Sequence, residues 1–258
     1  MKNTAAKMII TVMSLLTIIA ILAGLYIHVF SGDNPFGASA TASDSVTFEE
    51  DVKEILIEVD SAKINVEEGD KLSVEYVLPS GDDPVVNMQD GKLAVTGGRN
   101  RTIFSFGHVN EMKVNMKVPK GTKLDRFSVT LDAGKVSAGS IDAKQFILDS
   151  DAGDIDIHKV SSDSFELKVD AGNVSINDLT TGMATVKADA GNIQIAGSTI
   201  GTIDAQVDAG NLEVKDSTVD HGSCKADMGN ISLDGEIGDV LTDTGLGNAS
   251  INGRKTDK

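Results

Sequence analysis

Apolar and polar residues alternate over most of the chain after residue 47, in a pattern that returns every 19 residues. The triplet Asp-Ala-Gly occurs five times and then degrades to Asp-Met-Gly and Gly-Leu-Gly. A constant period of this length is typical of proteins built from stacked structural repeats. The steps are 19 residues long except for a last step of 18, and the repeat glycines are Gly134, Gly153, Gly172, Gly191, Gly210, Gly229 and Gly247.

Columns of apolar residues accompany these glycines, two and four residues after them and five and seven residues before them. The column seven residues before begins with Phe127, Phe146 and Phe165. Alternation predicts strands with one buried face, and the break in alternation at glycine predicts a corner. One coil cannot bury its own apolar side, so stacked coils make the core. We therefore predict an all-β fold, a single parallel β-solenoid with two or three short strands per 19-residue coil. A right-handed coil is expected from the usual hand of parallel crossovers, and the sequence leaves a left-handed one open.

Residues 47–120 are less regular and predict an N-terminal β region that caps the solenoid of residues 121–253. Part of this region already resembles one coil, with Ala62 where later coils have glycine. Residues 85–95 predict a β-hairpin that turns at Asp90-Gly91. Residues 254–258 form a polar tail after the last coil.

The first 46 residues predict a membrane anchor and a tether. Residues 8–30 contain no Asp, Glu, Lys or Arg and are long enough for one transmembrane helix. Lys2 and Lys7 precede the helix, which favours a cytoplasmic stub at 1–7 and an extracytoplasmic location for the bulk of a single-pass protein. The alternative is a signal peptide cleaved after Ala40. Residues 31–46 are small and polar and predict a flexible tether.

Charge and cysteine content narrow the possible partners. The formal net charge is -16, which disfavours nucleic acid as a partner because the surface repels phosphate. The single cysteine, Cys224, excludes an intramolecular disulfide and a cysteine-based zinc site, and it stands in an apolar column as a small core residue.

Two polar columns accompany the glycines, aspartates two residues before them and asparagines one residue after them. The aspartates could attract divalent cations, but a solvated edge whose carboxylates bond the corner backbone is the favoured interpretation. The asparagines predict a ladder of hydrogen-bonded amides. The aspartate column is Asp132, Asp151, Asp170, Asp189, Asp208 and Asp227, and the asparagine column is Asn173, Asn192, Asn211, Asn230 and Asn248.

One basic and aromatic segment lies outside the repeat. It could bind an anionic partner, although a role in covering the end of the core is favoured. Its residues are Arg99, Arg101, Phe104, Phe106 and His108.

The opening VDSAKINVEEGD, the stretch MKVPKGTKLDRFSV and the repeated DAGN motif resemble the bacterial putative-adhesin family of β-strand-repeat envelope proteins. The resemblance covers residues 50–253 and implies a fold rather than an activity. Some members are single-pass proteins encoded with cell-envelope-stress systems, and the family supplies no catalytic residues to carry over.

The sequence therefore favours a non-enzymatic, membrane-anchored surface protein that presents a rigid acidic solenoid for binding or adhesion, with no cofactor. The partner would be an envelope polymer or a membrane protein, and the oligomeric state stays open. A second hypothesis is an accessory or sensory component of an envelope-stress system. A third, less favoured, is a carbohydrate-active β-helix enzyme.

Overall fold

The computed structural model describes residues 41–79, 85–97, 112–252 and 254–255, and every regular element in them is a β-strand. Within these residues no helix is long and apolar enough to cross a membrane. The predicted helix at 8–30 and the basic and aromatic segment at 99–108 lie outside the described residues. The strands are β1 (Thr41–Phe48), β2 (Glu54–Gly69), β3 (Leu72–Pro79), β4 (Val85–Gln89), β5 (Lys92–Gly97), β6 (Met112–Pro119), β7 (Lys123–Ala171), β8 (Val174–Ala190), β9 (Ile193–Ala196), β10 (Thr199–Ala209), β11 (Leu212–Met228), β12 (Ile231–Leu246), β13 (Ala249–Ile251) and β14 (Arg254–Lys255).

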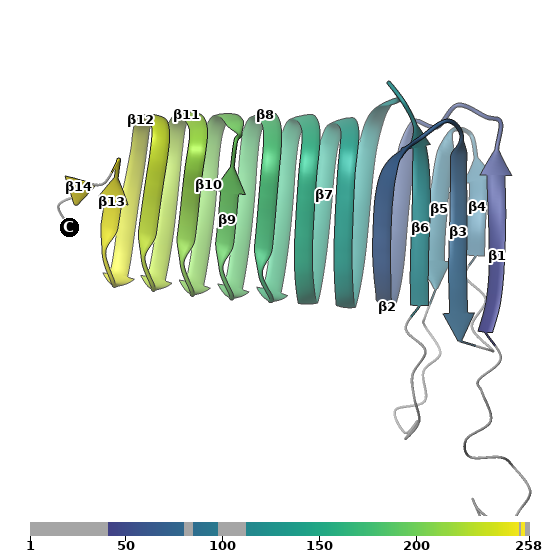
Figure 1. Cartoon of the computed structure of the whole chain (residues 1–258), viewed down its shortest axis with the longest axis horizontal. Coiled ribbons are helices and arrows are strands. Elements are labelled where there is room, and N and C mark those ends of the chain that lie inside the picture. Colours follow the sequence, from purple (N-terminus) through teal and green to yellow (C-terminus); the bar gives the residue numbers. More distant parts are fainter. Residues whose placement is uncertain (1–40, 80–84, 98–111, 253, 256–258) are drawn as a thin grey trace, which may run out of the picture. The chain divides into compact units, whose positions relative to one another are not determined.

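Strands β7 to β13 wind into a parallel β-solenoid, as the repeat predicts (Figure 1). Each residue pairs with the residue 19 positions later, so that Ile155 lies beside Val174 and Val174 beside Ile193. In Figure 1 the near strands run upward and the fainter far strands run downward while the chain advances from β2 towards β13, which is a right-handed coil. The last step of 18 residues is absorbed by a register shift between Val214 and Ser217 on β11.

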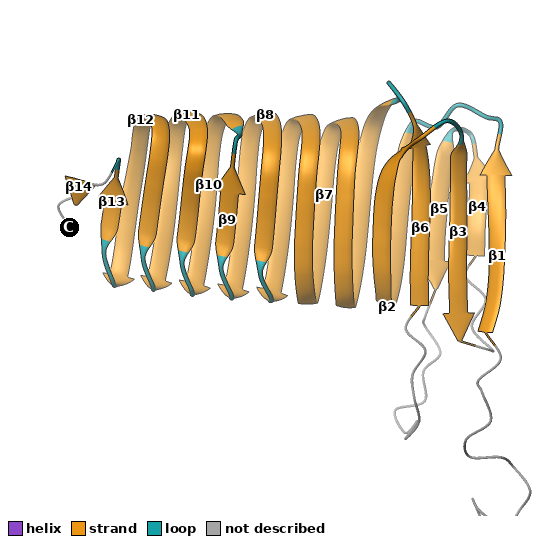
Figure 2. Ribbon diagram, viewed as in Figure 1, coloured by secondary structure: helices purple, strands orange, loops and turns teal. Residues whose placement is uncertain are grey.

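Each coil has three corners, because the alternation of buried residues breaks three times. In β8 the buried positions are Val174 and Ile176, then Leu179 and Thr181, then Ala184, Val186 and Ala188. One corner is at the repeat glycine. A second, which the sequence pattern did not reveal, has a positive φ in successive coils, at Ser140, Lys159, Asp178, Gly197 and Asp216. Figure 2 shows loops at the repeat-glycine corners from the end of β7 onwards, whereas the strand runs unbroken through the corners within β7.

The core runs the length of the solenoid as stacked columns of side chains. Phe127, Phe146 and Phe165 are at most 1% exposed and stack with ring centroids 5.0 and 4.9 Å apart. In the next coils Ala184 and Ile203 continue this column. Stacked aromatic rings bury a large apolar area and fix the register of neighbouring coils.

The N-terminal strands complete the solenoid in an order that differs from the sequence. Strand β2 forms most of a coil beside β7, with Ala62 in register with Gly134. On its other side β2 pairs with β5 and β6, which come later in the chain. Strands β3 and β4 then pair antiparallel to β6 and β5. The cap is therefore antiparallel, and β2 lies inside the solenoid.

Two predicted boundaries are wrong. The tether predicted for 31–46 ends too late, because β1 from residue 41 is a strand that pairs antiparallel with β3. Phe48 packs partly buried against the core, which explains why this polar segment joins the sheet. The polar tail predicted for 254–258 also begins too early, because Arg254–Lys255 pairs with β13.

Candidate functional site

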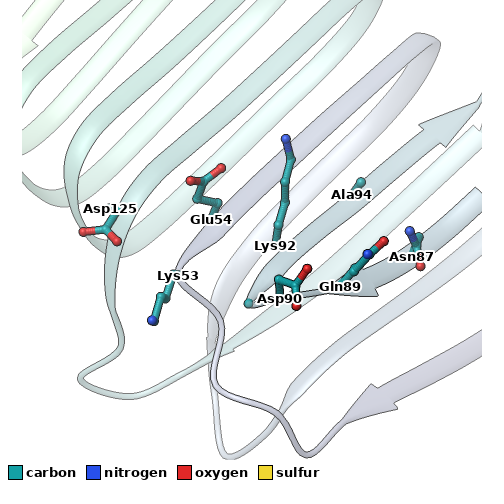
Figure 3. Close-up of a pocket in the computed structure, with 9 residues that line it drawn as sticks. Lys53, Glu54, Asn87, Gln89, Asp90, Lys92, Ala94 and Asp125 are labelled. Atoms are coloured by element: carbon teal, nitrogen blue, oxygen red, sulfur yellow. The ribbon is translucent and has the colours of Figure 1, made fainter.

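A polar cleft lies where the β4–β5 hairpin meets the first turns of β2 and β7 (Figure 3). Its volume is about 440 Å³. Seven of its nine lining residues carry a polar or charged side chain, while Gly91 and Ala94 leave space between them. The lining residues are Lys53, Glu54, Asn87, Gln89, Asp90, Gly91, Lys92, Ala94 and Asp125.

Backbone hydrogen bonds hold the three segments of the cleft together. The hairpin turns at Asp90 and Gly91, with φ of 51° and 79°, which confirms the predicted two-residue turn. The Gly91 carbonyl accepts hydrogen bonds from the backbone N–H of Lys53 at 2.7 Å and of Glu54 at 3.1 Å. The Lys53 carbonyl in turn accepts one from the Asp125 N–H at 2.7 Å. The cleft is therefore built on paired backbone.

Charges of both signs line the cleft. The Asp125 carboxylate accepts a hydrogen bond of 2.7 Å from Lys144 Nζ, which lowers the pKa of Asp125 through that bond and the attraction of its charge. Lys53 lowers the same pKa further by its charge. Glu54 and Lys92 project from neighbouring strands on the face drawn in Figure 3. Ammonium, carboxylate and amide groups together suit a ligand with many hydroxyl or amide groups better than an apolar one.

The repeat aspartates stack along an exposed to half-exposed column on the outer face of the solenoid. Neighbouring side chains bond some of them: Lys168 lies 2.8 Å from Asp170, and Lys225 lies 2.8 Å from Asp227. These bonds, and the attraction between the charges, raise the pKa of both lysines. Gln206 Nε2 donates to Asp208 at 3.0 Å. Side chains two residues upstream therefore bond three of these aspartates, Asp170, Asp208 and Asp227.

The aspartate column has a further member that the repeat did not reveal. Asp60 on β2 stands in register with Asp132, since their neighbours Val59 and Leu131 pair. The pKa of Asp132 is raised by partial burial first and then by the charges of Asp60 and Asp151. Among the described residues, no group of three or more His, Cys, Asp or Glu is arranged to hold a metal ion.

The repeat asparagines form a hydrogen-bonded ladder. Asn173 Oδ1 accepts from both the backbone N–H and the side-chain Nδ2 of Asn192, each at 3.2 Å. Asn192 Oδ1 and Asn211 Oδ1 accept in the same way from the asparagine of the next coil. The ladder begins at Asp154, whose Oδ1 accepts a hydrogen bond from the Asn173 backbone N–H. The ladder ends at Asn248, whose backbone N–H donates to Asn230 Oδ1 at 3.1 Å. Each amide bridges two coils, so this column stabilises the corner.

The repeat glycines occupy positions where there is no room for a side chain. Gly191 has a φ of 137°, and a Cβ there would lie closer than 3.0 Å to the carbonyl oxygen of Gly172. The other repeat glycines have the same relation to the preceding coil. Glycine is required because adjacent backbones approach closely at this corner.

The family model described as Toastrack DUF4097 matches residues 52–240. The chain belongs to the Toastrack DUF4097 family. This match spans the cleft and nearly all of the described solenoid. No curated protein matches the chain.

Several solved structures are similar to this Toastrack chain at low identity. A putative adhesin from Bacteroides fragilis is 15% identical over 83% of this chain and 98% of its own, with a TM-score of 0.47. A putative lipid binding protein from Parabacteroides distasonis is 18% identical over 83% and 97%, with a TM-score of 0.46. A putative cell adhesion protein from Clostridium sporogenes is 10% identical over 82% and 99%, with a TM-score of 0.37.

The cleft is the site that sequence reasoning missed. The hairpin at Asp90 was predictable, but Lys53 and Asp125 lie far from it in the sequence. They meet because β2 is inserted between β5 and β7. Of the two polar columns found in the sequence, the asparagines serve the fold, while the aspartates line a surface that solvent reaches.

Proposed function

We propose that this Toastrack chain is a non-enzymatic surface protein of the cell envelope, anchored by residues 8–30, that binds an envelope polymer through the polar cleft. Adhesion would follow from such binding, because a rigid solenoid holds the site in a fixed orientation. The net charge of -16 would keep polyanions away and favour neutral or amide-bearing polymers.

One observation carries this proposal: a cleft lined by seven polar or charged side chains stands on hydrogen-bonded strands. Binding sites need preorganised polar groups to orient a ligand, and paired backbone supplies that rigidity. Asn87 and Gln89 supply amide donors and acceptors from β4, and Lys92 and Glu54 supply charged ones from the neighbouring strands.

Cosedimentation of the full chain in detergent with purified cell-wall polysaccharide tests the proposal. We expect the double variant Asn87→Ala, Gln89→Ala to lose at least tenfold in binding, because it removes two amide groups from the cleft. The matched control Gln194→Ala, Ser232→Ala removes exposed polar side chains from another part of the solenoid and is expected to bind like the unchanged chain.

Two results would contradict the proposal. Equal binding by the cleft variant and the unchanged chain would exclude the cleft as the binding site. Release of reducing ends from the polysaccharide during incubation would show an enzyme and overturn the non-enzymatic role.

A further inference from the structure

The strands of the cleft place Glu54 and Lys92 directly opposite each other. Glu54 on β2 and Lys92 on β5 are register partners in a parallel pair, and both line the cleft. Gln89 on β4 is the register partner of Lys92 on its other side. Figure 3 shows the same order, with Lys92 between Glu54 and Gln89. An anion, a cation and an amide therefore lie in one row across three strands.

Glu54 and Lys92 stay unpaired, although opposite charges on neighbouring strands attract one another. Elsewhere on the solenoid such a pair closes: Lys144 Nζ and the Asp125 carboxylate, 19 residues apart in the chain, approach to 2.7 Å. In the described part of the chain, neither Glu54 nor Lys92 takes part in an ion pair or a side-chain hydrogen bond. Both charged groups are therefore available to a ligand.

Glu54 is the acidic group of the cleft that is best placed to hold a ligand cation. It is partly buried, whereas Asp90 at the hairpin turn is exposed. Water and salt screen a partly buried charge less than an exposed one, so an ion pair with Glu54 is stronger than one at the rim. The Asp125 carboxylate at the side of the cleft is already bonded by Lys144.

The mixed charges of the cleft select against ligands of one sign. A ligand with only carboxylate or phosphate groups would be attracted by Lys92 but repelled by Glu54 and by the net charge of -16. A ligand with only ammonium groups would be repelled by Lys92, and the exposed aspartates along the solenoid would attract it as well as the cleft does. A zwitterion satisfies both side chains. Neighbouring strands are about 4.8 Å apart, so an ammonium and a carboxylate on one carbon atom can contact both at once.

We propose that the polymer bound by the cleft carries free amino-acid groups, each with an ammonium and a carboxylate on one carbon atom. Glu54 accepts hydrogen bonds from the ammonium, and Lys92 donates to the carboxylate. The side-chain amides of Asn87 and Gln89 bond neighbouring amide or hydroxyl groups of the polymer. This inference rests on the proposed function, because it names the class of ligand for the same cleft.

Cosedimentation of the full chain in detergent with derivatised dextran beads tests the proposal. The probe is dextran that carries lysine coupled through Nε, which leaves the α-ammonium and the α-carboxylate free. One comparison bead carries Nα-acetyllysine and lacks the ammonium, and another carries lysinamide and lacks the carboxylate. In about 0.5 M sodium chloride, which screens exposed charges, we expect binding to the lysine beads to be at least tenfold stronger than to either comparison bead.

Two variants of the chain assign the two roles. Glu54→Gln is expected to bind the lysine and Nα-acetyllysine beads equally, and both better than the lysinamide beads, because only recognition of the ammonium is lost. Lys92→Gln is expected to bind the lysine and lysinamide beads equally, and both better than the Nα-acetyllysine beads. The matched controls Glu166→Gln and Lys135→Gln remove exposed charges from other coils and are expected to keep the tenfold preference of the unchanged chain.

Two results would overturn this inference. Equal binding of the unchanged chain to all three beads, or binding to none of them, would show that the amino-acid group is not recognised. The same loss of preference in Glu166→Gln as in Glu54→Gln would place that group outside the cleft. The proposed function would survive either result if the double variant Asn87→Ala, Gln89→Ala still loses binding to cell-wall polysaccharide, so the two failures are distinguishable.

Discussion

Replacing a single repeat glycine tests how closely the coils approach one another. Alanine at Gly191 would have to adopt a φ of 137°, a strained conformation that costs about 1–3 kcal/mol. Its Cβ would also overlap the Gly172 carbonyl oxygen, so the two coils must move apart. That movement disturbs the bond of 3.0 Å from the Gly191 N–H to the Ala209 carbonyl, and a lost backbone bond costs about 1 kcal/mol. We expect Gly191→Ala to lower the free energy of unfolding by roughly 3–4 kcal/mol.

Urea unfolding of the full chain in detergent, followed by far-ultraviolet circular dichroism, measures this loss. Gly182 in the preceding coil is the matched control, because a Cβ there would lie 3.1 Å from the Asp163 carbonyl oxygen and no unusual φ is required. Gly182→Ala and Asp189→Asn should each cost less than about 1 kcal/mol. Equal losses for Gly191→Ala and Gly182→Ala would refute the assignment of the repeat glycines to a closely packed corner.

Three further results are expected. Phe146→Ala should lower the free energy of unfolding by about 3–5 kcal/mol because it empties the middle of the aromatic stack, while Ile147→Ala on the outer face should cost clearly less in the same urea titration. Burial, and then the charge of Asp204, raises the pKa of Cys224 to about 12, so that only ~10⁻⁴ of this thiol is ionised at pH 8. Its reaction with a chromogenic disulfide should be slow in the folded chain and fast in urea, and equal rates would contradict its burial. Millimolar calcium should raise the melting temperature no more than sodium of matched ionic strength; a calcium-specific rise lost in Asp170→Asn with Asp189→Asn would show a cation site.

The sequence predicts the solenoid because its signal is repeated. Seven glycines and their apolar columns all indicate the same corner and the same buried faces. A departure at one position, such as the small Ala249 in a column of larger apolar residues, therefore does not hide the pattern. The amide ladder is predictable for the same reason, since Asn192 and Asn211 recur at one position of the coil.

Features without repetition are not readable in this way. The second corner carries serine, lysine, aspartate or glycine in successive coils, and only the backbone conformation unites Lys159 with Gly197. The insertion of β2 between β6 and β7 leaves no mark in the local pattern, because each strand alternates normally. The cleft depends on that insertion, so its residues could not be grouped from the sequence.

The proposed role depends on the solenoid lying outside the membrane. Protease added to intact cells measures this directly, with an antibody to the N-terminal stub and lysed cells as the control. We predict digestion of the solenoid in intact cells, with a membrane-anchored fragment that keeps residues 8–30. Full protection of the solenoid in intact cells, with digestion only after lysis, would contradict the proposed surface function.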